Sequence, residues 1–151
     1  MMRLTLAFLA AGMIVLTAGT GFAGGTLQEE ANKKVVVDFY EKALNQKDFD
    51  AASKHLGSRY TQHNPRVADG PEAFKGFLQM LREKAPTSHN EIKRVFADGD
   101  FVILHVHGKR DPGARGTAVV DIYRLENGKI VEHWDVLQNV PEQSANGNTM
   151  F

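Results

Sequence analysis

Cysteine is missing from this chain of 151 residues. Its absence excludes disulfides, thiolate zinc sites, a cysteine nucleophile and a lipid-modified cysteine anchor. An excess of charge of one sign is also missing, because 18 Lys and Arg residues balance 18 Asp and Glu residues. No basic excess or stripe therefore indicates a nucleic-acid partner or an anionic membrane surface. The length fits one domain, and the sequence contains no internal repeat and no low-complexity block.

The longest apolar run lies at the N-terminus. Arg3 precedes apolar residues 4–16, and residues 21–23 (GFA) have the small-x-small pattern of a signal-peptidase site. We predict a signal peptide over residues 1–23 and export to the periplasm or the medium, with no membrane attachment of the mature chain. The alternative is an uncleaved N-terminal anchor, although the run is short against the roughly 20 residues that a membrane span requires.

Helical periodicity dominates the first half of the mature chain. Apolar residues recur at spacings of three and four, and Asp48 and Pro71 supply helix-start signals. The predicted helices cover residues 27–45, 49–56 and 71–84. Residues 59–65 are predicted to be an extended or turn segment, because Pro65 disfavours helix at the residue before it.

Strand patterns fill the second half. Alternating apolar and polar residues predict strands over 91–97, 101–108, 117–125 and 129–138, with tight turns at 98–100 and 127–128. Helices followed by hairpin-linked strands indicate an α+β fold, with the helices packed on one side of an antiparallel sheet. The domain is expected to span residues 24–140, and the polar tail 141–151 is predicted to be flexible.

Side chains two residues apart share a face of a strand. We expect one concave face to carry a carboxylate and two histidines among aromatic and aliphatic walls, which is the composition of a small-molecule site. The sets assigned to this inner face are Phe101, Ile103, His105 and His107; Thr117, Val119, Asp121 and Tyr123; and Ile130, Trp134 and Val136.

Two segments resemble a known family. YTQHNP at residues 60–65 precedes a DGPEAF helix start, and DIYR at 121–124 is followed by ENGKIVEHWD at 126–135. This combination is similar to the SnoaL-like polyketide cyclases, and more narrowly to a bacterial branch described as SnoaL-like aldol-condensation enzymes, over residues 28–138. The resemblance implies the nuclear-transport-factor-2-like fold, a cone in which helices and a curved antiparallel sheet enclose an apolar pocket. The same fold hosts isomerases, dehydratases, cyclases and binding modules, so it does not fix the reaction.

An aldol closure needs a base that removes a proton α to a carbonyl group, and a donor that stabilises the resulting oxyanion. Asp121 is the only acidic residue in the middle of an apolar strand, and burial there would raise its pKa. The resemblance implies that Asp121 is the catalytic acid/base and that His107 assists it. The alternatives are a structural carboxylate paired with an arginine or a histidine, and a half-exposed histidine at a strand end.

Six further residues are predicted to bind the substrate: Tyr60, His63, Asn64, Phe77, His105 and Trp134. The first three of these would lie near the pocket mouth as orienting or oxyanion donors. His63 and Asn64 could equally fix the loop before Pro65, and the two large aromatic residues could simply be core or pocket wall.

No metal and no other cofactor is expected. His105 and His107, with His133 or Asp135, could form a two-histidine, one-carboxylate centre. His133 and Asp135, however, lie on the strand face opposite Trp134, which we assign to the pocket. A serine hydrolase is also disfavoured, because no Gly-x-Ser-x-Gly elbow is present.

The sequence therefore predicts a cofactor-independent acid/base enzyme that acts on a small, partly apolar carbonyl compound by aldol condensation, cyclisation or isomerisation. The alternative is an exported binding or interaction module without catalysis. A second apolar face of the sheet is expected to be covered by another subunit, in a homodimer or a higher even oligomer. Its residues are Val102, Leu104, Val106, Val120, Ile122, Val131 and Leu137.

Overall fold

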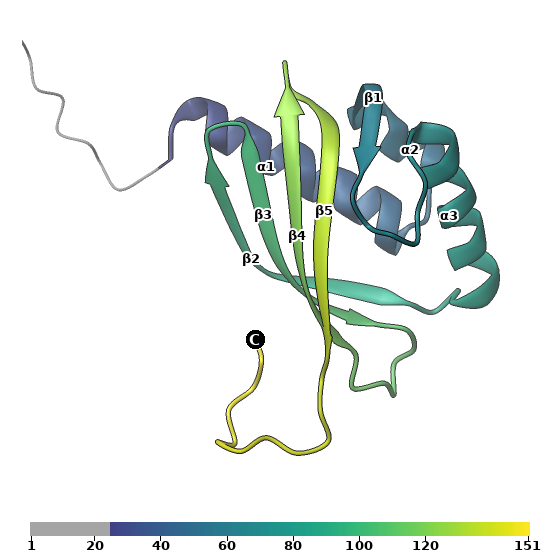
Figure 1. Cartoon of the computed structure of the whole chain (residues 1–151), viewed down its shortest axis with the longest axis vertical. Helices are drawn as coiled ribbons and strands as arrows, with labels where there is room; N and C mark the ends of the chain where they lie inside the picture. Colours follow the sequence, from purple (N-terminus) through teal and green to yellow (C-terminus); the bar gives the residue numbers. More distant parts are fainter. Residues whose placement is uncertain (1–24) are drawn as a thin grey trace, which may run out of the picture.

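The computed structural model describes residues 25–151 (Figure 1), and the predicted signal peptide over residues 1–23 lies outside the described residues. The elements are α1 (Leu27–Tyr40), the π-helical turn η1 (Glu41–Asn45), α2 (Phe49–Ala52), the 3-10 turn η2 (Ser53–His55), β1 (Leu56–Gln62), α3 (Pro71–Lys84), β2 (His89–Asp98), β3 (Phe101–Lys109), β4 (Thr117–Glu126) and β5 (Lys129–Asn139). The predicted α+β class is confirmed. The sequence pattern does not predict β1 as a strand.

The sheet is curved and unclosed, and its strand order is β1-β5-β4-β3-β2. Three antiparallel pairs form a meander from β2 to β5, whereas β1 runs parallel to β5 at the edge. Figure 1 shows α1 crossing one face of this sheet, while α3 follows β1 beyond the β5 side. This arrangement brings the end of β1 beside the middle of β5.

The start of α1 is fixed by a capping box. Thr26 Oγ1 accepts a hydrogen bond from the Glu29 backbone N–H at 3.2 Å, and Glu29 Oε2 accepts one from the Thr26 N–H at 2.6 Å. Glu29 also accepts a hydrogen bond from the Gly99 N–H at 3.0 Å, which ties the helix to the turn between β2 and β3. The cap thus sets where α1 crosses the sheet.

The core lies between the helices and the inner face of the sheet. Phe39 of α1 stacks on Phe74 of α3 with ring centroids 5.6 Å apart, and it meets the edge of Tyr123 of β4 at 5.8 Å. All three rings are buried. Such aromatic contacts add to the free energy gained by burying the rings, so they hold α1 and α3 over β4.

The predicted inner face of β3 is wrong. Residues paired across a sheet share a face, and the register pairs Val102 with Tyr123, Leu104 with Asp121 and Val106 with Val119. The three β3 residues of these pairs are fully buried, whereas His105 and His107 are only half-buried on the outer face. Alternation fixes which residues share a face, but both faces of β3 are apolar enough to resemble a core.

The predicted inner face of β5 is wrong at Trp134 and Val136 for the same reason, whereas Ile130 is in the core as predicted. Trp134 pairs with Ile122 on the outer face, whereas His133 pairs with Tyr123 and Asp135 pairs with Asp121 on the inner one. The outer face exposes large apolar side chains at Phe96, Phe101, Val120 and Val136. The expected partner surface is therefore this outer face and not Val102, Leu104 and Val106, and the homodimer itself stays a prediction.

Within residues 25–151, no helix has both the length and the apolar composition that crossing a membrane requires.

Candidate active site

A cavity of about 70 Å³ lies between the inner sheet face, the end of α1, α3 and the segment that follows β1. Phe74 and Phe77 of α3 form part of its apolar wall. Its polar wall contains Tyr40, Tyr60, Gln62, Asn64, Asp121, His133 and Asp135. An apolar cavity with a few convergent polar groups is the usual form of a small-molecule site.

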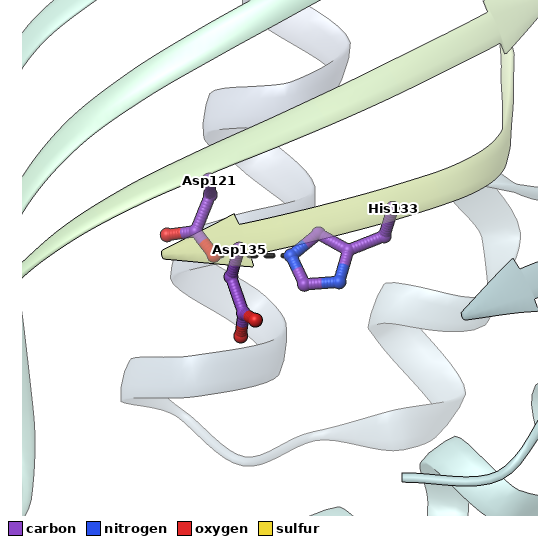
Figure 2. A group of neighbouring side chains, drawn as sticks. All are labelled: Asp121, His133 and Asp135. Carbon is purple, nitrogen blue, oxygen red and sulfur yellow. Dashed lines mark hydrogen bonds and ion pairs between the residues drawn. The ribbon is translucent and has the colours of Figure 1, made fainter. Parts of the chain in front are cut away.

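Asp121 and His133 form a buried pair at this wall. Asp121 is in the middle of β4, His133 is on the neighbouring strand β5, and the two residues are 5% and 6% exposed. His133 Nε2 lies 3.0 Å from Asp121 Oδ1 (Figure 2). The alternation of β4 places the carboxylate inward because Val119 and Tyr123 on either side of it belong to the core.

Gln62 determines which ring nitrogen of His133 carries a hydrogen. Gln62 Oε1 accepts the backbone N–H of Asn64 at 2.9 Å and also faces His133 Nδ1 at 2.8 Å. A backbone N–H can only donate, so this side-chain atom is the amide oxygen and His133 Nδ1 must carry a hydrogen. One further proton then lies between His133 Nε2 and Asp121 Oδ1. The pair is either an imidazolium with a carboxylate or a neutral imidazole with a carboxylic acid.

The surroundings of Asp121 oppose its ionisation. Burial raises the pKa of Asp121, the contact with His133 lowers it, and the nearby Asp135 carboxylate raises it again. Asp121 Oδ2 is buried and has no hydrogen-bond partner among the described residues. The Tyr40 hydroxyl slightly lowers the pKa of Asp121, although the geometry of their contact falls short of a hydrogen bond.

Tyr40 and Tyr60, two of the three tyrosines that line the cavity, stay protonated. Burial, and secondly the charge of Asp121, raises the pKa of Tyr40 and of Tyr60 above that of an ordinary phenol. The Tyr60 hydroxyl accepts a long hydrogen bond from Gln62 Nε2 at 3.5 Å. Both phenols therefore keep their O–H groups near neutral pH and can donate them beside the carboxylate.

Asp135 adds a second carboxylate to the inner face. It is half-buried, it pairs with Asp121 across β4 and β5, and Asn64 Nδ2 donates a hydrogen bond to its Oδ2 at 2.6 Å. Gln62 and Asn64 both come from the end of β1 and the residues after it. The end of β1 and the residues that follow it thus supply the amides that orient His133 and Asp135.

Four of the predicted site residues line the cavity together: Asp121, Tyr60, Asn64 and Phe77. The structure does not bring His107 to Asp121, because His107 pairs with Ala118 on β4 and faces outward. Its Nε2 lies 2.7 Å from the Arg115 carbonyl oxygen, and its ring stacks on Phe151 of the tail at 4.0 Å. His105 is on the same outer face, with its Nδ1 2.9 Å from Arg94 Nη1.

His63 and Trp134 are also outside the cavity. Their rings stack on the outer face with centroids 4.6 Å apart and planes 4° from parallel. His63 Nε2 also lies 2.9 Å from Glu132 Oε1. These contacts pin the segment after β1 to β5, which is a structural role beside the site.

His133, Asp135, Tyr40 and Gln62 were not among the predicted site residues. The alternation along β5 correctly places His133 and Asp135 on the face opposite Trp134. The face assigned to the pocket, however, was the one that carries Trp134. For Gln62 the signal was the alternation of Tyr60, Gln62 and Asn64, which line the cavity, with His63, which does not. No sequence signal marks Tyr40, because its place depends on where α1 crosses the sheet.

Comparisons with known proteins agree with this fold. The family described as SnoaL-like polyketide cyclase matches residues 34–143. No curated protein sequence matches the chain.

Solved structures show the same architecture at low identity. An NTF2-like protein of unknown function from Cytophaga hutchinsonii is 23% identical, with a TM-score of 0.59 over 71% of this chain and 89% of that one. TsrD from Streptomyces laurentii is 18% identical, with a TM-score of 0.61 over 74% and 91% of the two chains. An uncharacterized cystatin-fold protein from Novosphingobium aromaticivorans is 24% identical, with a TM-score of 0.61 over 70% and 97%. These likenesses establish the nuclear-transport-factor-2-like fold.

Proposed function

Because this chain belongs to the SnoaL-like polyketide cyclase family, we propose that it is a cofactor-independent acid/base enzyme acting on a small, partly apolar carbonyl compound. The reaction class is aldol condensation, cyclisation or isomerisation. The observation that supports this proposal is the buried Asp121–His133 pair, whose Oδ1 and Nε2 atoms lie 3.0 Å apart at the wall of an apolar cavity. Paired groups whose surroundings oppose full ionisation are typical of acid/base sites.

Asp121 is the base in this proposal. Its carboxylate accepts a proton from the carbon next to the substrate carbonyl, and the same proton returns to carbon or oxygen when the product forms. His133 takes the assisting role that the sequence analysis gave to His107, because it exchanges a proton with Asp121 through Nε2. Tyr40 and Tyr60 donate O–H groups to the enolate oxygen, which stabilises the charge that develops there.

The size of the cavity supports a small substrate. Its volume is about 70 Å³, whereas sites for drug-sized ligands measure roughly 300–1,000 Å³. Phe77 and Val67 line the cavity on the side of α3 and the preceding segment, and they limit the length of any compound that enters. A ketone or aldehyde with a short apolar chain fits this wall composition better than a polycyclic compound does.

The first experiment is proton exchange in heavy water. We expect the chain to accelerate incorporation of deuterium next to the carbonyl of at least one compound in a panel of short ketones and aldehydes, followed by NMR in the presence of EDTA. His107→Gln should exchange as fast as the wild type, because His107 is on the outer face. Tight binding of a panel member without any exchange would overturn the enzyme proposal and leave a binding module.

The pH dependence of the same exchange tests the role of His133. The contact with His133 lowers the pKa of Asp121, so His133→Gln should raise that pKa, while Asp135 and Tyr40 still act on Asp121 as before. Exchange requires ionised Asp121 and is lost as the pH falls through its pKa. The acid limb of the rate profile should therefore move to higher pH in His133→Gln. An unmoved limb would contradict proton sharing between the two residues, with His107→Gln as the unshifted reference.

A further inference from the structure

We propose that Asp121, His133 and Asp135 bind one divalent transition-metal ion of the Zn²⁺ type, in the place of the proton that Asp121 and His133 share. Each residue offers one ligand atom, and these three atoms all lie within 4.8 Å of one another. Figure 2 shows Asp121 and His133 facing each other from β4 and β5, with the Asp135 side chain beside their contact. Asp121 and Asp135 face each other in the sheet register, so the backbone holds the group together.

The tautomer of His133 suits metal binding. Because Nδ1 carries a hydrogen toward Gln62 Oε1, the loss of the shared proton leaves the Nε2 lone pair directed at the two carboxylates. Metal-bound histidines usually donate their other ring N–H to an oxygen acceptor in this way, which fixes the ring and increases its basicity. Gln62 is thus a positioning residue for the proposed ion.

The charges of the group also favour a cation. With both carboxylates ionised and the imidazole neutral, the group carries two negative charges. Among the described residues, His133 is the only ion-pair partner of Asp121, and Asp135 forms no ion pair. Asp121 Oδ2 is buried without any hydrogen-bond partner in the same part of the chain. A divalent ion would neutralise both carboxylates, which a single proton cannot do.

Only a modest adjustment is needed to close the ligands on an ion. Zn²⁺ lies about 2.1 Å from nitrogen and oxygen ligands, so tetrahedral ligand atoms are roughly 3.4 Å apart. Asp135 is the half-buried member and is held through one oxygen by Asn64, so its side chain can rotate inward. The cavity beside the group has room for water as a fourth ligand. One imidazole with two carboxylates suits Zn²⁺, Co²⁺ or Mn²⁺.

The ion and the shared proton exclude each other. A metal-loaded chain is therefore expected to lose the exchange activity, and this regulatory consequence rests on the proposed function. Metal binding itself does not rest on it, since binding is measured without any substrate.

The test is metal titration of the full chain after removal of bound metal with a chelator. Calorimetry with ZnCl₂ should give one site per chain, and CoCl₂ should produce the visible absorption of a Co²⁺ ion with few ligands. We expect His133→Gln and Asp135→Asn each to raise the Zn²⁺ Kd by at least about 100-fold, and Gln62→Leu by about 10- to 100-fold. At Zn²⁺ concentrations near 100 times Kd, the wild-type Tm should rise by about 10 °C.

His107→Gln is the matched control, because it removes a histidine that lies outside the cavity. Its Zn²⁺ Kd should equal that of the wild type. A Zn²⁺ Kd above about 100 µM for the wild type, or equal weakening by His107→Gln and His133→Gln, would overturn the metal proposal. Asp135→Asn changes a half-exposed side chain and guards against misfolding of the buried His133 variant. Exchange measured in EDTA reports on the proposed function independently of these outcomes.

Discussion

In the Asp121→Asn variant, the rate of carbonyl-directed proton exchange should fall by about 1,000-fold, within the range that a positioned acid or base contributes. Asparagine has the shape of the carboxylate but cannot accept the proton. The measurement is kcat/KM for deuterium incorporation into the best compound of the ketone and aldehyde panel. A loss of this size with unchanged substrate affinity would identify Asp121 as a group that acts in the transition state rather than in binding.

The fold should tolerate Asp121→Asn. When Nδ1 carries the hydrogen, Nε2 of a neutral His133 is an acceptor, so the amide N–H of asparagine can donate to it. The amide oxygen can then face the Tyr40 hydroxyl. The variant also removes a carboxyl group whose ionisation is opposed by burial. We therefore expect a Tm no lower than that of the wild type. A variant that exchanges as fast as the wild type would eliminate Asp121 as the base, and one that unfolds would show that the shared proton holds the pair together.

The main elements of this fold follow from local patterns in the sequence. The start of α3 is marked by Pro71, and the β4–β5 hairpin is marked by Asn127 and Gly128, which both have positive φ in the structure. The sequence predicts only residues 59–65 as extended or turn and places residue 56 in a helix, so it does not predict β1, whose partner β5 lies some 70 residues later in the chain. A parallel edge pairing of that separation leaves no trace in the local pattern.

The site was harder to predict than the fold, because it depends on which face of each strand is covered. Asp121 was predicted because a carboxylate within an apolar strand is conspicuous in any sequence. His133 and Asp135 have no such contrast, since the neighbouring Trp134 is the larger apolar residue and looked like the inward one. The stacking of Trp134 on His63 explains why this tryptophan lies outside. Only the strand register with β4 decides between the two faces.

The largest stability effect is expected at Gly116, where the chain enters β4. A methyl group there would meet the Gly108 carbonyl oxygen at 2.3 Å and His107 Nε2 at 2.9 Å, and the φ of Gly116 is +86°. Gly108 is in β3, and it pairs with Thr117, the residue that follows Gly116. The clash therefore cannot be relieved without separating β3 from β4. Gly116→Ala should lower the free energy of unfolding by about 3 kcal/mol or more, as the urea midpoint will report.

Gly128→Ala is the matched control for Gly116→Ala. Gly128 also has a positive φ, +72°, but a methyl group there would meet nothing within 4 Å. Gly128→Ala should therefore lower the free energy of unfolding only by the cost of a left-handed backbone conformation for alanine, about 1–2 kcal/mol. The difference between the two variants isolates the close approach of the Gly116 backbone to β3. Because β3 and β4 together position Asp121, Gly116→Ala should also lower exchange in the fraction that stays folded, whereas equal urea midpoints for the two variants would contradict the close approach.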